Sequence, residues 1–117
     1  MPNHQGSLDQ VFQALADPTR RAIVQRLITG PASVSELARP LAMSLPAVMQ
    51  HLQALQACGL VRTAKAGRVR TCTIDPGGLR LAETWLQTQR TAWEHRLDRL
   101  QDYLDDQPPT TSNPQGS

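Results

Sequence analysis

The 117-residue sequence predicts a mainly α fold with one small β-hairpin, an α+β domain of about five helices and a two-stranded ribbon. Three observations lead to this prediction. Helix start signals recur along the chain, each a Ser or Asp followed closely by Pro or Glu. Two short alternating segments flank Ala66-Gly67, as in a hairpin. The length and the apolar fraction of 39% suffice for one core and hardly for two.

Two short helices joined by a three-residue turn are predicted between residues 33 and 57. The first starts at Ser33-Val34-Ser35-Glu36, a capping box in which the serine hydroxyl and the glutamate carboxylate satisfy free backbone amides. It ends before the turn Ala42-Met43-Ser44. Ser44 then caps the second helix, and Pro46 lies in its first turn, where a missing N–H costs nothing. This succession is a helix-turn-helix.

Helical spacing gives the second of these helices an apolar and a polar side. Four apolar residues recur at three- and four-residue spacing and are expected to face the core: Leu45, Val48, Leu52 and Leu55. Near the opposite side we expect Ser44, Ala47, Gln50 and His51. This polar side is the one that would meet a binding partner.

A basic β-hairpin follows directly. Gly59 ends the second helix, and residues 60–63 and 69–74 alternate as strands. Four cations fall within nine residues with no acid among them: Arg62, Lys65, Arg68 and Arg70. Such charges can simply keep a solvated hairpin from aggregating. Beside a helix-turn-helix they favour contacts with phosphates or a minor groove, so we predict a winged helix-turn-helix that binds double-stranded DNA, with residues 62–72 as the wing.

Two helices precede this part of the chain, and one long helix follows it. The first is marked by Leu8, Val11, Phe12 and Leu15. The second starts at Asp17-Pro18, with the aspartate as N-cap, and stops at Gly30-Pro31. Downstream, Asp75-Pro76-Gly77-Gly78 is predicted to be a turn, and a helix then runs from about residue 79 to about residue 103.

The last helix has apolar residues seven apart, with others between them: Leu79, Leu86, Trp93 and Leu100, then Ala82, Leu97 and Leu104. This stripe can pack on its own domain, with Trp85 and Trp93 as ordinary core. A second copy is the simpler partner, because a two-fold dimer places two recognition helices about 34–36 Å apart, one turn of DNA. We therefore predict a homodimer that reads a palindromic operator.

The predicted organisation has three parts. Residues 1–7 form a flexible N-terminus, residues 8–106 form the winged helix-turn-helix domain with its dimerisation helices, and residues 107–117 form a disordered tail rich in Pro, Thr, Ser and Gln. Residues 1–78 have a net charge of +4, against +2 for the whole chain, so the positive charge is concentrated in the DNA-binding part.

Four segments resemble the ArsR/SmtB family of bacterial winged-helix repressors: ALADPTRRAIV at 14–24, SELA at 35–38, SLPAVMQHL at 44–52 and GLV at 59–61. The resemblance covers about residues 8–106 and implies a homodimeric repressor. Its implied groove-facing residues are Ser44, Pro46, Ala47, Gln50 and His51, and its implied wing contacts are Arg68 and Arg70. The charge of the hairpin adds Lys65 to the predicted DNA-binding residues. Its implied dimer interface lies in the terminal helices, at Leu8, Val11, Phe12, Leu15, Leu79, Leu86, Trp93, Leu97 and Leu100.

Two residues of the recognition helix have the chemistry for specific contacts. The amide of Gln50 can bond an adenine edge both as donor and as acceptor, and a good pair of this kind discriminates by about 1–3 kcal/mol. His51 can contact a base or a phosphate. It can equally be a partly buried histidine that orients the helix.

The sequence departs from the family where a sensor would lie. Residues 35–41 hold neither cysteine nor histidine, so the thiol metal site that many members have in this helix is absent. His95, Asp98 and Asp102, next to Glu94, could supply metal ligands from one helix face, but one histidine among alternating charges is typical of a solvated face. Cys58 and Cys72 could form a thiol switch, although both are typical small buried hydrophobes. We predict no metal and no cofactor.

Other classes of protein are disfavoured. No nucleophile elbow, HExxH motif or P-loop is present, so we expect no enzyme. No apolar run could span a bilayer and no signal-peptide pattern begins the chain, so we expect a cytoplasmic protein without a membrane partner. A winged-helix module that binds another protein remains the alternative. No sequence motif identifies the operator, the target genes or the effector, or distinguishes repression from activation.

Overall fold

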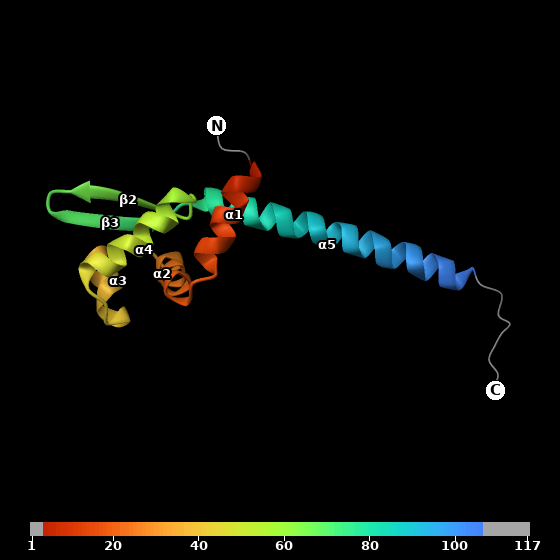
Figure 1. The fold of residues 1–117 in the computed structure, drawn as a ribbon, viewed down its shortest axis with the longest axis horizontal. Coiled ribbons are helices and arrows are strands. Elements are labelled where there is room, and N and C mark those ends of the chain that lie inside the picture. Colours follow the sequence, from red (N-terminus) through yellow and green to blue (C-terminus); the bar gives the residue numbers. More distant parts are fainter. Residues whose placement is uncertain (1–3, 107–117) are drawn as a thin grey trace. The chain divides into compact units, whose positions relative to one another are not determined.

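The computed structural model describes residues 4–106, with side chains from residue 8 onward. Within that range the element order is α1 (His4–Leu15), α2 (Pro18–Ile28), β1 (Ala32–Ser33), α3 (Val34–Leu41), α4 (Leu45–Ala57), β2 (Val61–Ala66), β3 (Val69–Ile74) and α5 (Pro76–Asp105) (Figure 1). The mainly α fold with a small β wing is confirmed. Helix α1 begins four residues before Leu8, while the predicted tail, 107–117, lies outside the described residues.

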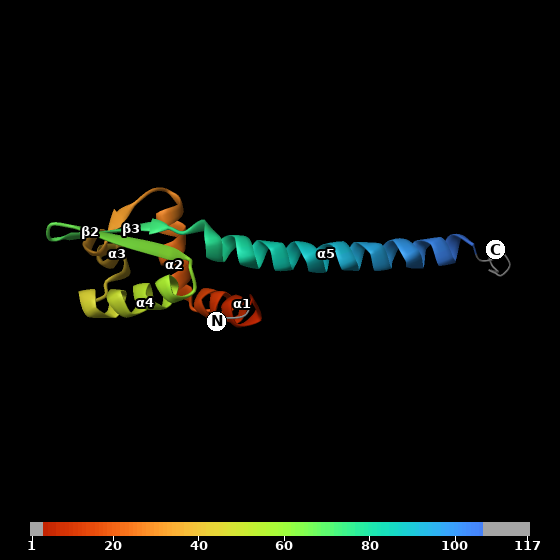
Figure 2. The same cartoon turned by 90° about the horizontal axis from the view of Figure 1, so that it is seen from above.

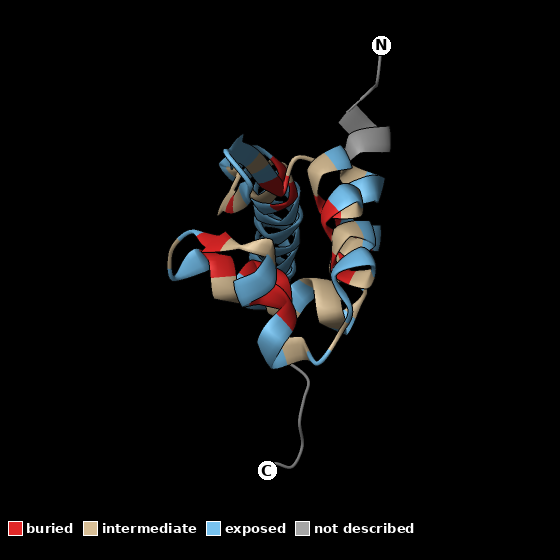
Figure 3. Cartoon of the chain, turned by 90° about the vertical axis from the view of Figure 1, so that its left-hand side faces the viewer, coloured by how far each residue is buried: buried red, intermediate tan, exposed pale blue. Residues whose placement is uncertain are grey.

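Two compact units divide the chain, Met1–Glu83 and Thr84–Ser117. In the first unit α4 runs beside the hairpin of β2 and β3 in both views (Figures 1 and 2). The core of this unit is purely apolar, because no polar or charged side chain of the described residues is buried (Figure 3). Its largest fully buried side chains are Val11, Ile23, Leu37, Val48, Leu52, Leu55, Leu60 and Cys72.

The three helix starts that the sequence predicts at Asp17, Ser33 and Ser44 are confirmed. The carboxylate of Asp17 accepts hydrogen bonds from the amides of Thr19 and Arg20, at 2.8 and 3.1 Å. Ser33 and Glu36 form the reciprocal capping box, at 3.1 and 2.8 Å. Each of these caps satisfies backbone donors that a helix start leaves without partners. They fix the first turns of α2 and α3 from local sequence alone.

Acid is expected to destabilise the fold through three capping carboxylates. Each accepts a backbone hydrogen bond that lowers its pKa below the ordinary value of 3.8 for Asp and 4.5 for Glu: Asp17 from Arg20, Glu36 from Ser33, and Asp75 from Gly77. A lowered folded-state pKa adds stability above the unfolded-state value, and this stability is lost as the pH falls through the folded-state value. Urea titrations should therefore show that the free energy of unfolding decreases as the pH is lowered below about 4.5.

Asp17→Asn is the matched control for this prediction, because asparagine keeps the N-cap and removes the titrating group. Its stability should depend less on pH in the acid range than that of the parent chain. An identical pH dependence would contradict the role given to this carboxylate.

The wing belongs to a three-stranded antiparallel sheet with the order β1-β3-β2. Strand β1 pairs Ala32 with Cys72, and it was not predicted, because two residues carry no alternating pattern. The hairpin itself is confirmed. Ala66 pairs with Val69 across the loop, and Gly67 has a φ of 62°, which the tight connection requires.

The predicted turn at residues 75–78 is wrong, because helix α5 already starts at Pro76. The amide of Gly77 donates to the Asp75 carboxylate at 3.0 Å, so Asp-Pro is a helix start here just as it is at Asp17-Pro18. The two glycines suggested a turn. Gly78 instead permits a close contact, since its amide donates to the carbonyl of Gly59 at 2.8 Å.

Within the second unit, α5 has a row of exposed apolar side chains: Trp85, Leu86, Trp93, Leu97, Leu100, Tyr103 and Leu104. Their exposed fractions lie between 43% and 63%. None of the helices in the described range combines the length and the apolar content needed to cross a membrane.

Candidate nucleic-acid interface

Of the polar side predicted for helix α4, Ser44 and Gln50 are exposed, whereas Ala47 and His51 are half-buried. Val48, Leu52 and Leu55 are fully buried. With 3.6 residues per turn, the opposite side carries Pro46, Gln50, Gln53 and Ala57, all of them exposed. Sequence reasoning found Gln50 and missed Gln53, although the three-residue spacing between the two glutamines was a signal for it. Two amide side chains thus project from the centre of this surface.

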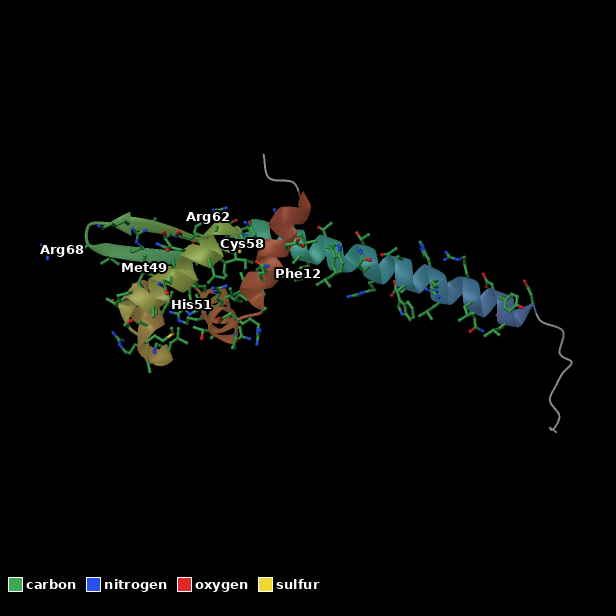
Figure 4. The ribbon with its side chains drawn as sticks, viewed as in Figure 1. Phe12, Met49, His51, Cys58, Arg62 and Arg68 are labelled. Carbon is green, nitrogen blue, oxygen red and sulfur yellow. The ribbon has the colours of Figure 1, made fainter. Side chains whose placement is uncertain are left out.

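Leu45 does not face the core, which corrects the predicted apolar side of this helix. Its side chain is 49% exposed, because the buried series of α4 begins one turn later, at Val48. Leu45 lies instead on the side of α4 that is turned toward the wing, together with the partly buried Met49 (Figure 4). The three- and four-residue spacing of the apolar residues on α4 is confirmed, but its first member, Leu45, lies outside the core.

His51 lies on the side of α4 that faces α2 (Figure 4). Nε of Arg20 donates a hydrogen bond to Nδ1 of His51 at 3.2 Å, between residues 31 positions apart in the chain. This contact orients His51 and leaves its other ring nitrogen, Nε2, without a hydrogen bond to any residue that the structure describes. In the neutral ring this contact makes Nδ1 the acceptor and leaves the hydrogen on Nε2.

The wing tip concentrates positive charge. Lys65 and Arg70 are direct register partners, so two cations stand opposite each other on one face of the ribbon, and Arg68 lies at the end of the loop (Figure 4). Like charges in such a pair destabilise a hairpin. An anion bound between them would offset the repulsion.

A hydrogen-bond network connects the wing to α4. The hydroxyl of Thr63 accepts from Nε2 of Gln56 at 2.7 Å and from Nη1 of Arg70 at 3.1 Å. Gln56 belongs to α4, Thr63 to β2 and Arg70 to β3. The guanidinium of Arg70 is therefore held in a fixed position relative to α4.

A groove separates the first turns of α4 from the wing tip, and it has a volume of about 350 Å³. Besides the start of α3, its lining consists of Leu45, Met49, Lys65, Arg68, Val69 and Arg70. None of its lining residues, all of which the structure describes, is acidic. The lining of the groove thus combines apolar side chains with three cations.

The sensor candidates of the sequence have ordinary surroundings. Cys58 and Cys72 are buried, and burial raises the pKa of both thiols, so the reactive thiolate form is disfavoured. His95, Asp98 and Asp102 are exposed on α5. No three His, Cys, Asp or Glu side chains within the described range are grouped as a metal site would require.

A helix-turn-helix followed by a basic wing defines a winged helix-turn-helix protein. Comparison with known proteins agrees with this class. Residues 15–64 match a protein family described as a helix-turn-helix domain. The chain is 53% identical to the HTH-type transcriptional regulator Rv2034 of Mycobacterium tuberculosis over 78 residues, which are 67% of this chain and 73% of that protein.

Solved structures give the same result. A crystal structure of an ArsR family transcriptional regulator, RHA00566, is 50% identical with a TM-score of 0.74, over 80% of this chain and 97% of that one. A homodimeric winged helix-turn-helix DNA-binding domain, Mb0332 from Mycobacterium bovis, is 30% identical with a TM-score of 0.58, over 76% and 81% of the two chains. The chain belongs to the ArsR family of winged helix-turn-helix transcriptional regulators.

Proposed function

We propose that this regulator is a homodimeric repressor that binds a palindromic operator, with α4 in the major groove and the wing on the DNA backbone or in the minor groove. The surface of α4 that carries Gln50 and Gln53, beside a wing tip with two opposed cations, is the observation behind this proposal. The site residues are those expected from the sequence, Ser44, Pro46, Ala47, Gln50, His51, Lys65, Arg68 and Arg70, extended by Gln53.

The groove between α4 and the wing fits one strand of the DNA backbone. With α4 in the major groove and the wing in the neighbouring minor groove, the strand that separates the two grooves passes between them. Lys65, Arg68 and Arg70 then contact its phosphates, while Leu45 and Met49 contact the apolar edges of its sugars. This arrangement gives a role to the exposed Leu45, which the core does not bury.

The apolar row of α5 is the proposed dimer surface. Leu86, Trp93, Leu97 and Leu100 were predicted for this role, and Tyr103 and Leu104 extend the row. Leu8, Phe12, Leu15 and Leu79 complete the proposed set. Val11 is removed from it, because the core of its own unit buries it completely and leaves no surface for a partner. The homodimeric relative from Mycobacterium bovis favours this assembly.

Repression follows from occupancy in this proposal. A dimer that covers a promoter blocks polymerase, and an effector that releases the dimer must favour the DNA-free conformation by a few kcal/mol.

Replacement of Gln50 by Ala is expected to weaken binding to the operator about 5- to 100-fold, which corresponds to one lost bidentate base contact. Binding to random DNA should stay within about twofold, because the amide carries no charge to a phosphate. Operator sequences selected from a random pool, followed by fluorescence anisotropy on the selected and a scrambled duplex, measure both affinities. Gln25→Ala, at an exposed glutamine of α2, is the matched control. Equal losses on both duplexes would remove Gln50 as a specificity residue.

A further inference from the structure

We infer that Arg20 of α2, which is not among the site residues assigned above, joins His51 of α4 to form a binding site for one DNA phosphate. The inference rests on the proposed function and extends it to α2. It starts from the hydrogen bond of 3.2 Å between Nε of Arg20 and Nδ1 of His51, two partly buried side chains from different helices.

This hydrogen bond leaves the other donors of both side chains without protein partners. Nε2–H of His51 and the Nη groups of Arg20 make no hydrogen bond to any residue that the structure describes. A guanidinium keeps its charge and presents its donors in a planar fork, and that geometry matches the oxygens of a phosphate. The pair therefore offers several N–H donors and one positive charge from neighbouring positions.

The carboxylate of Asp17 interacts electrostatically with both Arg20 and His51 and so offsets part of this charge, but it does not pair with the guanidinium within the described residues. It accepts instead from the amides of Thr19 and Arg20. The carboxylate thus serves the first turn of α2, while the side chain of Arg20 is directed toward α4. The other α2 arginines are bonded within their own surroundings, Arg21 to the carbonyl of Leu15 and Arg26 to that of Gly30.

The position of the pair favours DNA as the source of the phosphate. His51 directly follows Gln50 on α4, so a ligand of the pair lies at the border of the surface that enters the major groove. The wing lies on the other side of α4, beyond Leu45 and Met49. Contacts on both sides of the helix would hold both strands that border the major groove, and this fixes the depth and register of α4.

Because a phosphate contact acts on every sequence, random DNA is the proper probe. Arg20→Gln is expected to weaken binding of a random 30-base-pair duplex and of the selected operator by the same factor, about tenfold. The dependence of log K on log salt should also become less steep, by about 0.9 in the magnitude of its slope. Arg26→Gln makes the same change in net charge on the same helix and should alter neither quantity. Arg20→Lys keeps the charge, so it should keep the slope.

A second variant keeps the inference testable if Arg20→Gln fails to fold. His51→Asn retains an acceptor for Arg20 near the position of Nδ1 and removes the Nε2–H donor, so it should weaken both duplexes several-fold without a change of slope. The inference is overturned if folded variants at both positions bind random DNA as tightly as the parent chain does. It is also overturned if Arg26→Gln lowers the affinity for DNA as much as Arg20→Gln does. A parent chain that binds neither duplex would instead refute the proposed function itself.

Discussion

Gly78→Ala is expected to lower the free energy of unfolding by about 3 kcal/mol, as overpacking does when the surroundings cannot move. A Cβ at this position would lie 2.7 Å from the carbonyl oxygen of Gly59 and 2.9 Å from that of Cys58. Both contacts are with backbone atoms, so no side chain can rotate away. Alanine is the better helix former, but its gain of about 1 kcal/mol is smaller than the cost of this clash. Urea denaturation followed by circular dichroism measures the difference.

Gly77→Ala is the matched control, one residue earlier in the same helix turn. The nearest atom to its Cβ would be the Asp75 carboxylate oxygen at 3.3 Å, the end of a side chain that can adjust. This variant should be as stable as the parent chain or slightly more stable. Equal stability of the two variants would show that the start of α5 can shift away from Gly59.

The contact at Gly78 joins two elements with different proposed tasks. The amide of Asp75 donates to the carbonyl of Leu60 at 2.9 Å, and that of Gly78 donates to Gly59, so the first turn of α5 is bonded to the segment that ends α4. The ion pair of Arg62 with Asp75, at 3.4 Å, is exposed and adds little. A displacement of the start of α5 would therefore act on the segment that ends α4 through these backbone contacts.

Local chemistry made most of the fold predictable from the sequence. The caps at Asp17, Ser33 and Ser44 depend on residues within one turn, and each was predicted correctly. Asp75 carries the same signal, but the two glycines after Pro76 also match the pattern of a turn. Gly78 is required instead by its close approach to Gly59, a contact between residues 19 positions apart that no local pattern contains.

The candidate site was predictable in outline only. Gln50 and the basic wing follow from helical spacing and charge, which the sequence displays directly. The hydrogen bond from Arg20 to His51 joins two helices, and the network from Gln56 through Thr63 to Arg70 joins a helix to both wing strands. Such contacts are determined by how the elements pack, so a sequence without its fold cannot reveal them.

Combined replacement of the three wing-tip cations, Lys65→Gln, Arg68→Gln and Arg70→Gln, is expected to weaken DNA binding about 100- to 1,000-fold. Because three phosphate contacts are lost, the slope of log K against log salt should become less steep, by about 2.7 in magnitude. The loss should be similar for operator and random duplexes, because phosphates carry no sequence. The fold should persist, since Lys65 and Arg68 are exposed and the repulsion between Lys65 and Arg70 disappears.

The matched control removes three exposed cations from α5 by Arg80→Gln, Arg90→Gln and Arg99→Gln, so that both variants have the same net charge. Anisotropy titrations at several salt concentrations then separate a local contact from a general effect of charge. If the wing contacts the backbone, the α5 variant keeps both its affinity and most of its salt slope. Equal losses for the two variants would mean that the wing attracts DNA only through net charge, and the groove beside α4 would then have no strand in it.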